Sequence, residues 1–301
     1  MDPTKQLYES EARGWQRGLY DDIKQTLRAP IVNSIWRIQM FHTPQFLRYA
    51  WGQLKPVFET REFAAFTVAY RDTLLTAVES ELPNYDPATV DLPPSAFTEL
   101  QSQLATFDIV SPRLIVLFKL MDRQLNDRAV GTNASDAGEA ATAPFPEWLD
   151  RDRGRPPTML SQDEARAALP DTLAGDFDGM VPSIYRCLAQ WPSYLERAWD
   201  DLAPLLRSDA FETAREEALD LAETYLDRLA YTPLVDPATL TEMGFDESTV
   251  GELQDLFAMF TTTGSEVVPV LPVYAATVEA SGDRDTLTFP GWNHRCPDSS
   301  S

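Results

Sequence analysis

Two stretches of the chain, PQFLRYAWGQLKP at residues 44–56 and PSYLERAWDDLAP at residues 192–204, fit one frame. Both read P-x-[FY]-L-x-x-A-W-x-x-L-x-P, and their starts lie 148 positions apart. In each copy Leu, Ala, Trp and Leu fall at i, i+3, i+4 and i+7, the spacing of one apolar helix face. The leading proline suits the first turn of a helix, where its missing N–H costs nothing. The frame therefore predicts the same buried helix in two places.

A second match follows in the same order along the chain. ELQSQLATF at residues 99–107 and ELQDLFAMF at residues 252–260 share the frame ELQ-x-x-x-A-x-F. Two ordered matches predict an internal duplication. The sequence thus predicts a first helical repeat, a flexible linker rich in acidic residues, Ala, Gly and Pro, a second helical repeat and a tail, at 1–126, 127–157, 158–281 and 282–301.

The rest of the pattern is helical. Apolar residues at helical spacing run from Leu7 to Leu27, and Pro30 follows. Ser161 with Glu164 three residues later is typical of a capping box. Only EVVPVLPVY, at 266–274, has a β-like composition, and its prolines argue against a central strand. The predicted fold class is all-α, with two tandem pseudo-symmetric helical repeats and a cleft between them that is suited to a ligand.

The charge of the chain is unusual. It has 301 residues with 47 acidic against 25 basic side chains, a net charge of −22, and only four of the bases are lysines. An acidic surface with little Lys indicates a halophilic protein, since the Debye length falls to about 3 Å at 1 M salt; an ordinary acidic cytosolic protein is the alternative. Such a charge argues against nucleic acid and against an anionic membrane as partners.

Cysteine and histidine are too sparse for several kinds of site. The chain has only Cys187, Cys296, His42 and His294, without metal-ligand spacing. We therefore expect no metal site and no Ser-His-Asp triad. Cys187 lies inside an apolar helical pattern and is expected in the core. Without a signal peptide or a long apolar run, the sequence predicts a reduced, cytoplasmic protein.

Three segments resemble a known family. YDDIKQTLRAPIV at 20–32 resembles the Tyr-x-Asp-Ile…Thr-Leu-Arg-x-Pro-x-Val opening of the all-helical group I 2-haloacid dehalogenases, and LAQWPSYL at 188–195 resembles their Leu-Ala-Asn-Trp-Pro segment. TFDIVSP at 106–112 stands where that family has Phe-Asn…Asn-Pro. The resemblance implies a helical homodimer that needs no cofactor. It also implies hydrolytic removal of halide from 2-haloalkanoic acids of either hand by an activated water, without a covalent intermediate.

The resemblance also implies substrate-binding positions. In the window PSIYRCLAQW, at 182–191, the residues on either side of the family's water-activating Asp match, but the Asp position itself is Ile184. One family Asn is replaced by serine, and a pocket Trp and Phe are replaced by isoleucine and serine. The substrate-binding residues implied in this way are Ile31, Ser34, Ser111, Ser183, Ile184 and Tyr185.

The isoleucine leaves the expected reaction without a proton acceptor. A positioned general base contributes roughly 10²–10⁴-fold to a rate. Asp178 or Asp176 in GDFDG and Asp108 in TFDIVSP are candidate catalytic substitutes. The alternative for each is an ordinary turn, capping or solvated residue.

A carboxylate substrate also needs donors. Arg28, Arg37 and Arg186 are candidates, and an aromatic residue followed by Arg recurs in both copies; surface salt bridges are the alternative. Two hypotheses therefore stand. One is a hydrolase that acts on small halogenated or other carboxylic acids. The other is a non-catalytic relative that binds a small organic acid or serves as a scaffold.

Overall fold

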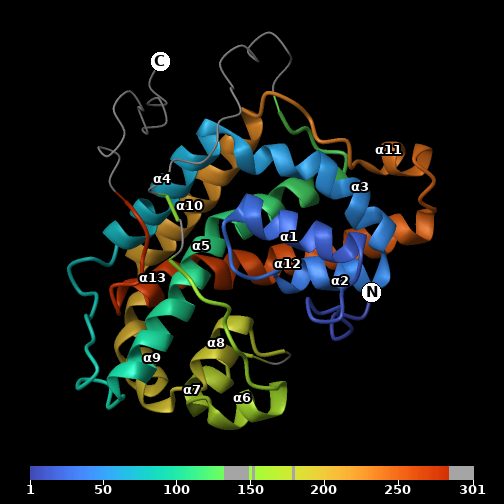
Figure 1. The fold of residues 1–301 in the computed structure, drawn as a ribbon. Helices are drawn as coiled ribbons and strands as arrows, with labels where there is room; N and C mark the ends of the chain where they lie inside the picture. Colours follow the sequence, from blue (N-terminus) through green and yellow to red (C-terminus); the bar gives the residue numbers. More distant parts are fainter. Residues whose placement is uncertain (132–148, 151–152, 178–179, 285–301) are drawn as a thin grey trace, which may run out of the picture.

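The structure, a computed structural model, describes residues 1–131, 149–150, 153–177 and 180–284 (Figure 1). In this part of the chain the regular elements are all helices, so the all-α prediction is confirmed. The stretch with β-like composition, 266–274, is helical as well.

The helices lie on both sides of residues 132–148. The helices before residue 132 are α1 (Trp15–Leu27), α2 (Ser34–His42), α3 (Pro44–Leu54), η1 (Lys55–Glu59), α4 (Arg61–Thr76) and α5 (Pro94–Leu125). Those after it are α6 (Gln162–Ala168), α7 (Asp171–Ala174), α8 (Ser183–Leu188), α9 (Pro192–Leu206), α10 (Asp209–Asp227), α11 (Pro237–Glu242), α12 (Glu247–Val267), η2 (Val268–Val270) and α13 (Leu271–Ala276).

The two matching frames form α3 and α9. Each helix begins at the proline of its frame, Pro44 or Pro192. Trp51 is 3% exposed and donates from its indole nitrogen to Asp22 at 2.7 Å. Trp199 is 6% exposed and donates to Thr172 at 2.9 Å. Both tryptophans are therefore core residues whose one polar atom is satisfied, as a buried indole requires.

Of two local predictions from the sequence, the capping box of α6 is confirmed and the start of the first helix is wrong. Ser161 and Glu164 form the predicted capping box at α6. The first helix, however, begins only at Trp15, although the apolar spacing starts at Leu7. Gly14 precedes it with φ of 54°, in the left-handed region where a right-handed helix cannot continue.

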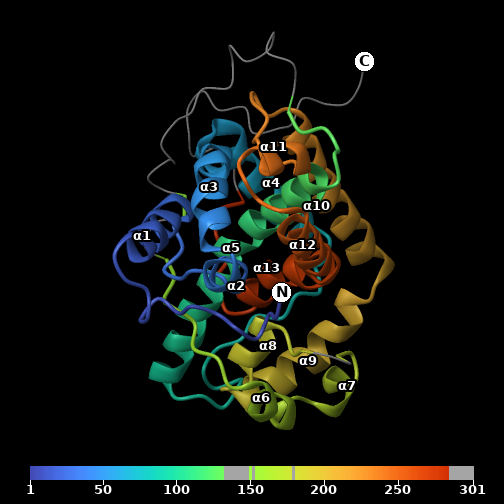
Figure 2. The same cartoon turned by 90° about the vertical axis from the view of Figure 1, so that its right-hand side faces the viewer.

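Helix α5 is the axis of the molecule. Helices α12 and α13 pack along it, and α4 packs against α10, which also contacts α5. Figures 1 and 2 show α6 to α9 gathered at one end of the protein, away from α3, α4 and α11. The core therefore runs along α5, which also contains the segment 106–112 that resembles the family.

Helices from corresponding places in the predicted repeats pack against each other. Helix α4 is capped by Thr60, which accepts from Phe63 N, and α10 by Ser208, which accepts from Phe211 N. These caps lie 148 positions apart, as do the two frames. The contacts of α4 with α10 and of α5 with α12 are those expected of two related halves. The duplication and the cleft between its copies stay predictions.

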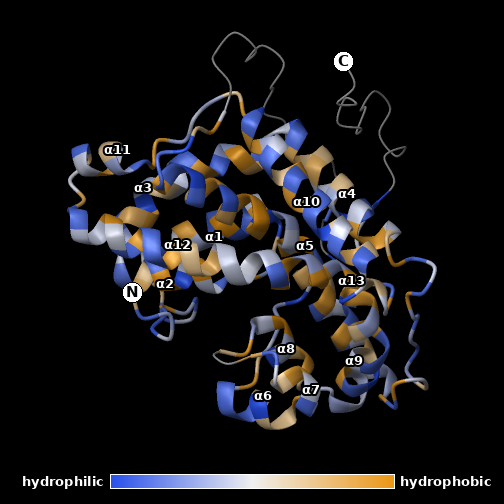
Figure 3. Ribbon diagram, turned by 180° about the vertical axis from the view of Figure 1, so that it is seen from behind, coloured by the Kyte–Doolittle hydropathy of each residue, from blue (hydrophilic) through white to orange (hydrophobic). Residues whose placement is uncertain are grey.

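One described segment, Glu247–Ala276, is long and apolar enough to cross a membrane by length and composition alone. Half of its most apolar window is buried inside the protein, and its helices α12 and α13 pack on α5. Figure 3 shows apolar and polar residues mixed along these helices rather than gathered in one band. This arrangement is that of a core helix.

One end of the expected linker is anchored. Leu149 is fully buried and packs with Ala64 and Val68 of α4, and Asp150 is 1% exposed. The middle of the linker, 132–148, and most of the expected tail, 285–301, lie outside the described residues. The anchoring has a chemical cause, which is a set of buried charges.

Candidate functional site

The candidate residues come from three places in the fold. Asp108 and Ser111 lie one turn apart in α5, while Ser183, Ile184 and Tyr185 are the first residues of α8. Ile31 precedes α2, and Ser34 is its first residue. Asp178 lies outside the described residues.

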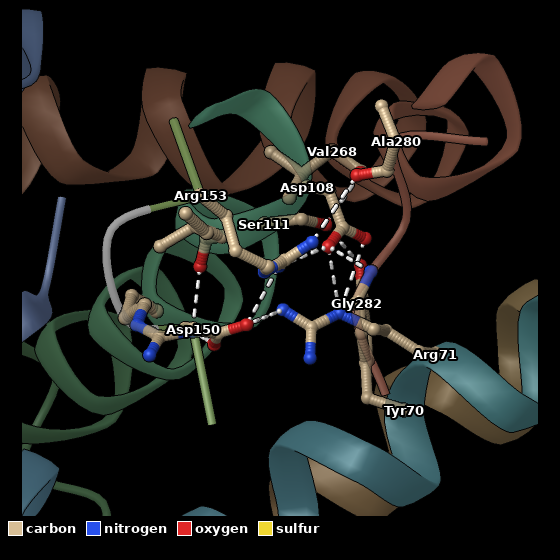
Figure 4. Close-up of polar contacts among 11 residues, drawn as sticks. Tyr70, Arg71, Asp108, Ser111, Asp150, Arg153, Val268, Ala280 and Gly282 are labelled. Atoms are coloured by element: carbon tan, nitrogen blue, oxygen red, sulfur yellow. Dashed lines mark hydrogen bonds and ion pairs between the residues drawn. The ribbon is translucent and has the colours of Figure 1, made fainter. Parts of the chain in front are cut away.

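Asp108 belongs to a buried set of five charged side chains, which we term the arginine–aspartate cluster (Figure 4). Its members are Arg71, Asp108, Arg113, Asp150 and Arg153. Arg71 comes from α4, Asp108 and Arg113 come from α5, and the other two come from the anchored end of the linker. All are at most 1% exposed except Arg153, whose side chain is 22% exposed.

The contacts of the cluster are short and interlocked. Arg71 Nε lies 2.9 Å from Asp108 Oδ2, and Arg71 Nη2 lies 2.8 Å from Asp150 Oδ1. Arg113 Nη1 lies 2.8 Å from Asp150 Oδ2. Arg153 Nη2 lies 2.8 Å from Asp108 and 2.6 Å from Asp150. Charges buried in this way are tolerated because each has partners of opposite sign.

The cluster sets the ionisation of its members. Burial alone would raise the pKa of Asp150, but Arg71, Arg113 and Arg153 overcome this effect and hold that pKa well below its ordinary value. Burial lowers the pKa of Arg113 to about 10, against the opposing effect of Asp150. With three arginines and two aspartates, the cluster carries a surplus of one positive charge.

The surroundings of Asp108 leave its carboxylate little freedom. It is fully buried and accepts from Arg71, Arg153 and the backbone N–H of Gly282, the last at 2.9 Å. A side chain on Gly282 would not fit, because its Cβ would come within 2.8 Å of Arg71. These contacts favour a role for Asp108 in joining α4, α5 and the segment that contains Gly282. Its role as a catalytic substitute stays a prediction.

Ser111 faces the same region. Its hydroxyl donates to the carbonyl of Val268 at 2.8 Å and lies 3.1 Å from the hydroxyl of Tyr70 (Figure 4). Because the serine proton is directed to Val268, Tyr70 is the donor in the second contact. Burial raises the pKa of Tyr70 well above its ordinary value, so its proton stays in place. Pro112 follows and cannot donate to the Asp108 carbonyl, which weakens the α5 ladder at this point.

The residues of α8 point into aromatic and aliphatic surroundings. Ile184 is 1% exposed. The Tyr185 ring packs on Tyr274 of α13 with centroids 5.9 Å apart, and on Phe177 at 5.2 Å. Burial raises the pKa of Tyr185 to about 12. Since α13 packs along α5, Tyr274 links the start of α8 to the helix of Asp108 and Ser111.

Ile31 and Ser34 are half-buried. The residues that follow Ser34 repeat those that follow Ser183, as S-I-W-R at 34–37 and S-I-Y-R at 183–186. Both segments begin a helix, and both isoleucines are 1% exposed. Ile184, where the resemblance implies the family Asp, thus repeats the aliphatic residue of the chain's own first half.

Sequence reasoning missed most of the cluster. Arg71 and Arg113 stand inside apolar helical stretches, and a charge within such a stretch is a signal that could have been used. Asp150 and Arg153 gave no such signal, because their segment is polar and rich in Gly and Pro. Cys187, as expected, is fully buried. Among the described residues, no three His, Cys, Asp or Glu side chains gather as metal ligands would.

Comparisons with known proteins agree with the resemblance noted in the sequence. Residues 30–170 match the family described as halocarboxylic acid dehydrogenase DehI. The chain is 24% identical to an (R)-2-haloacid dehalogenase from Pseudomonas putida over 251 residues, which are 80% of this chain and 82% of that protein. It is 26% identical to a configuration-inverting 2-haloacid dehalogenase from Pseudomonas sp. (strain 113) over 234 residues, 73% of this chain and 74% of that one.

Solved structures show the same fold. A D-2-haloacid dehalogenase mutant in complex with D-2-CPA superposes with a TM-score of 0.73 at 20% identity, covering 90% of this chain and 94% of that one. A D-2-haloacid dehalogenase in complex with L-LA gives a TM-score of 0.69 at 21% identity, covering 90% and 95%. The likeness therefore extends over nearly the whole chain.

Proposed function

The chain belongs to the family of 2-haloacid dehalogenases, and from this premise we propose that it hydrolyses a small 2-halocarboxylic acid. In this reaction a water oxygen bonds to C2, and the carbon–halogen bond breaks with its electron pair leaving as halide. The water gives up a proton, and the product is a 2-hydroxy acid. The protein must therefore hold a carboxylate, admit one water and accept one proton.

The observation that carries the proposal is the extent of the similarity. Two 2-haloacid dehalogenases align with 80% and 73% of the chain. The family match covers residues 30–170, which include Ile31, Ser34 and Ser111 and end before α8. Since function depends on a site rather than on a fold, the residues of this chain still have to supply the chemistry.

The proposed reaction needs a group that accepts the proton of the attacking water. Ile184 has no group that accepts a proton, and Asp108 is engaged with Arg71 and Arg153. We propose that hydrolysis, where it occurs, uses a carboxylate other than that of the family position, with Asp178 and Asp108 as the candidates. A relocated base is expected to give a slow enzyme, because general-base catalysis depends on close placement beside the water.

A second candidate function follows from the same isoleucine. A family member that binds a small organic acid without reacting needs donors for the carboxylate but no base. The fully buried Ile184, repeated as Ile35 in the first half, fits this alternative. The two functions make opposite predictions for halide release.

Restoring the family residue gives the sharpest experiment. Halide release from each enantiomer of 2-chloropropionate would be measured with the wild-type protein, Ile184→Asp and Ile184→Asn, at low salt and in molar potassium salt. We expect slow release by the wild-type protein. We expect Ile184→Asp to be faster by about 10²–10⁴-fold, the usual contribution of a positioned base.

The asparagine variant is the control, since it has the size and polarity of aspartate but accepts no proton. It should resemble the wild-type protein. If neither the wild-type protein nor Ile184→Asp releases halide above buffer, while both bind the acid, hydrolysis is excluded and the binding function stands. Melting temperatures of all three proteins show whether each is folded under the assay conditions.

A further inference from the structure

The arginine–aspartate cluster holds more positive than negative charge inside the protein. Arg71, Asp108 and Asp150 are each at most 1% exposed. The described carboxylates that pair with Arg71 and Arg153 are those of these two aspartates alone. A buried charge without a counter-charge is costly, because the interior has a low dielectric constant. The surplus of one positive charge therefore favours the binding of one negative charge at this place.

One nitrogen of the cluster is a donor without an acceptor. Arg71 uses Nε for Asp108 and Nη2 for Asp150, at 2.9 Å and 2.8 Å. Its Nη1 is buried and makes no hydrogen bond to a described residue, and no dashed line reaches it in Figure 4. Buried polar atoms are ordinarily hydrogen-bonded, and those of charged groups especially so. Arg71 Nη1 is thus a charged donor that is available to a ligand.

The backbone beside this nitrogen belongs to a glycine. Gly282 donates its N–H to Asp108 at 2.9 Å. A Cβ on Gly282 would stand 2.8 Å from Nη1 of Arg71 and 2.5 Å from Nη2 of Arg153. The side of Gly282 that would carry a side chain therefore faces both guanidinium groups. A free ion, unlike a fixed side chain, can take its own hydrogen-bonding distance here, since the Arg153 side chain is 22% exposed and able to move.

The donors favour an ion of a single atom. A carboxylate is bound best by two parallel N–H groups of one guanidinium, but Nε and Nη2 of Arg71 are already engaged. The neighbouring carboxylates of Asp108 and Asp150 would repel an anion with two charges. A monovalent, spherical anion needs one strong donor and balances a surplus of one charge.

We propose that the arginine–aspartate cluster binds one halide ion, such as chloride or bromide, at Nη1 of Arg71. Arg153 is the member of the cluster that reaches solvent, so the ion would enter and leave beside it. The inference goes beyond the proposed function, because halide from the surrounding salt is sufficient and no turnover is needed.

The first test is the effect of bromide on stability. Only the folded chain brings Arg71 and Arg153 together, so a bound ion stabilises the folded state by linkage. The equilibrium constant for unfolding should fall by up to about tenfold for each tenfold rise in bromide concentration above the dissociation constant. It would be measured by urea denaturation in potassium bromide, with potassium glutamate added to keep the ionic strength constant.

Arg153→Gln is the decisive variant, because it leaves a cluster of two arginines and two aspartates without surplus charge. Its stability should no longer depend on bromide. Arg123→Gln is the matched control. Arg123 is 13% exposed and pairs with Glu223 at 2.7 Å outside the cluster, so this substitution removes the same charge from the protein. Arg123→Gln should keep the bromide dependence of the wild-type protein. Equal dependence in all three proteins would overturn the proposal.

The ion can also be located directly, which does not require any variant to fold. Crystals of the wild-type protein grown in bromide should give an anomalous scattering peak within hydrogen-bonding distance of Arg71 Nη1. Peaks at the surface alone would overturn the proposal. Acetate that stabilises the wild-type protein as strongly as bromide would assign the site to a carboxylate and overturn the choice of halide. These outcomes do not involve halide release, so failure of the proposed hydrolysis would leave them unchanged.

Discussion

Two groups of arginines in this protein differ in how their charge is balanced. In the arginine–aspartate cluster, Arg71, Arg113 and Arg153 each lie within 2.9 Å of a buried carboxylate. Arg37 and Arg186 form no ion pair with a described acid. The same side chain thus serves two purposes. Paired arginines join segments of the chain, whereas Arg37 lies against the ring of Tyr8 and Arg186 donates to the carbonyl of Leu160.

The difference has an energetic basis. Removing one partner from a buried ion pair leaves the other charged and desolvated, which is costly. Removing an arginine that has no acid partner leaves no such charge behind. The comparison therefore predicts that similar substitutions will have unequal effects on stability, which the following measurements can sharpen or refute.

The largest effect is expected from Asp150→Ala. Asp150 faces Arg71, Arg113 and Arg153, so its loss leaves three arginines with one aspartate. We expect the free energy of unfolding to fall by about 3–5 kcal/mol, measured by urea denaturation. The control is Asp72→Ala, because Asp72 is 54% exposed in its pair with Arg284 and should cost at most about 1 kcal/mol. Equal effects of the two substitutions would refute a special role for the cluster.

A smaller effect is expected in the pH dependence of stability. The arginines hold the pKa of Asp150 below its ordinary value of 3.8, so its contribution is complete above pH 3.8 and is lost as the pH falls further. Below pH 3.8 the Asp150 carboxylate becomes protonated in the unfolded chain but stays ionised in the folded protein. The gap in unfolding free energy between wild type and Asp150→Asn should therefore shrink by up to about 1.4 kcal/mol per pH unit. Parallel curves for the two proteins would show that Asp150 is not stabilised in its charged form.

The smallest effect is expected from Arg37→Gln without ligand. No ion pair to a described acid is broken, so the free energy of unfolding should change by less than about 1 kcal/mol. Arg71→Gln, the same substitution inside the cluster, should cost about 3–5 kcal/mol under the same conditions. A loss of that size for Arg37→Gln would mean that the unpaired arginine is structural after all.

The sequence predicted several local features because they depend on neighbouring residues alone. The prolines at 44 and 192, the capping pair Ser161 and Glu164, and the buried tryptophans were all read from spacing and were confirmed. The start of α1 was placed too early, since apolar spacing continued across Gly14 while the backbone did not.

The candidate site was predictable only in part. Matching short segments to a family gave Ile31, Ser34, Ser111 and the start of α8, and comparison with known proteins supports that family. The other members of the cluster could not be predicted from the sequence. Arg71 is 37 residues away from Asp108 along the chain, and Asp150 lies in a stretch expected to be flexible. Ion pairs between distant segments leave no periodic trace in a sequence.

The amino-acid sequence by itself determined that this protein is helical and where several of its helices begin, and it predicted that Ile184 stands at the position of the family aspartate. Each of these depends on side-chain chemistry and on spacings of a few residues. Only the tertiary structure decided which charges are matched. It paired Asp108 and Asp150 with three arginines and left Arg37 and Arg186 without an ion pair to a described acid, because electrostatic partners are chosen by distance in space.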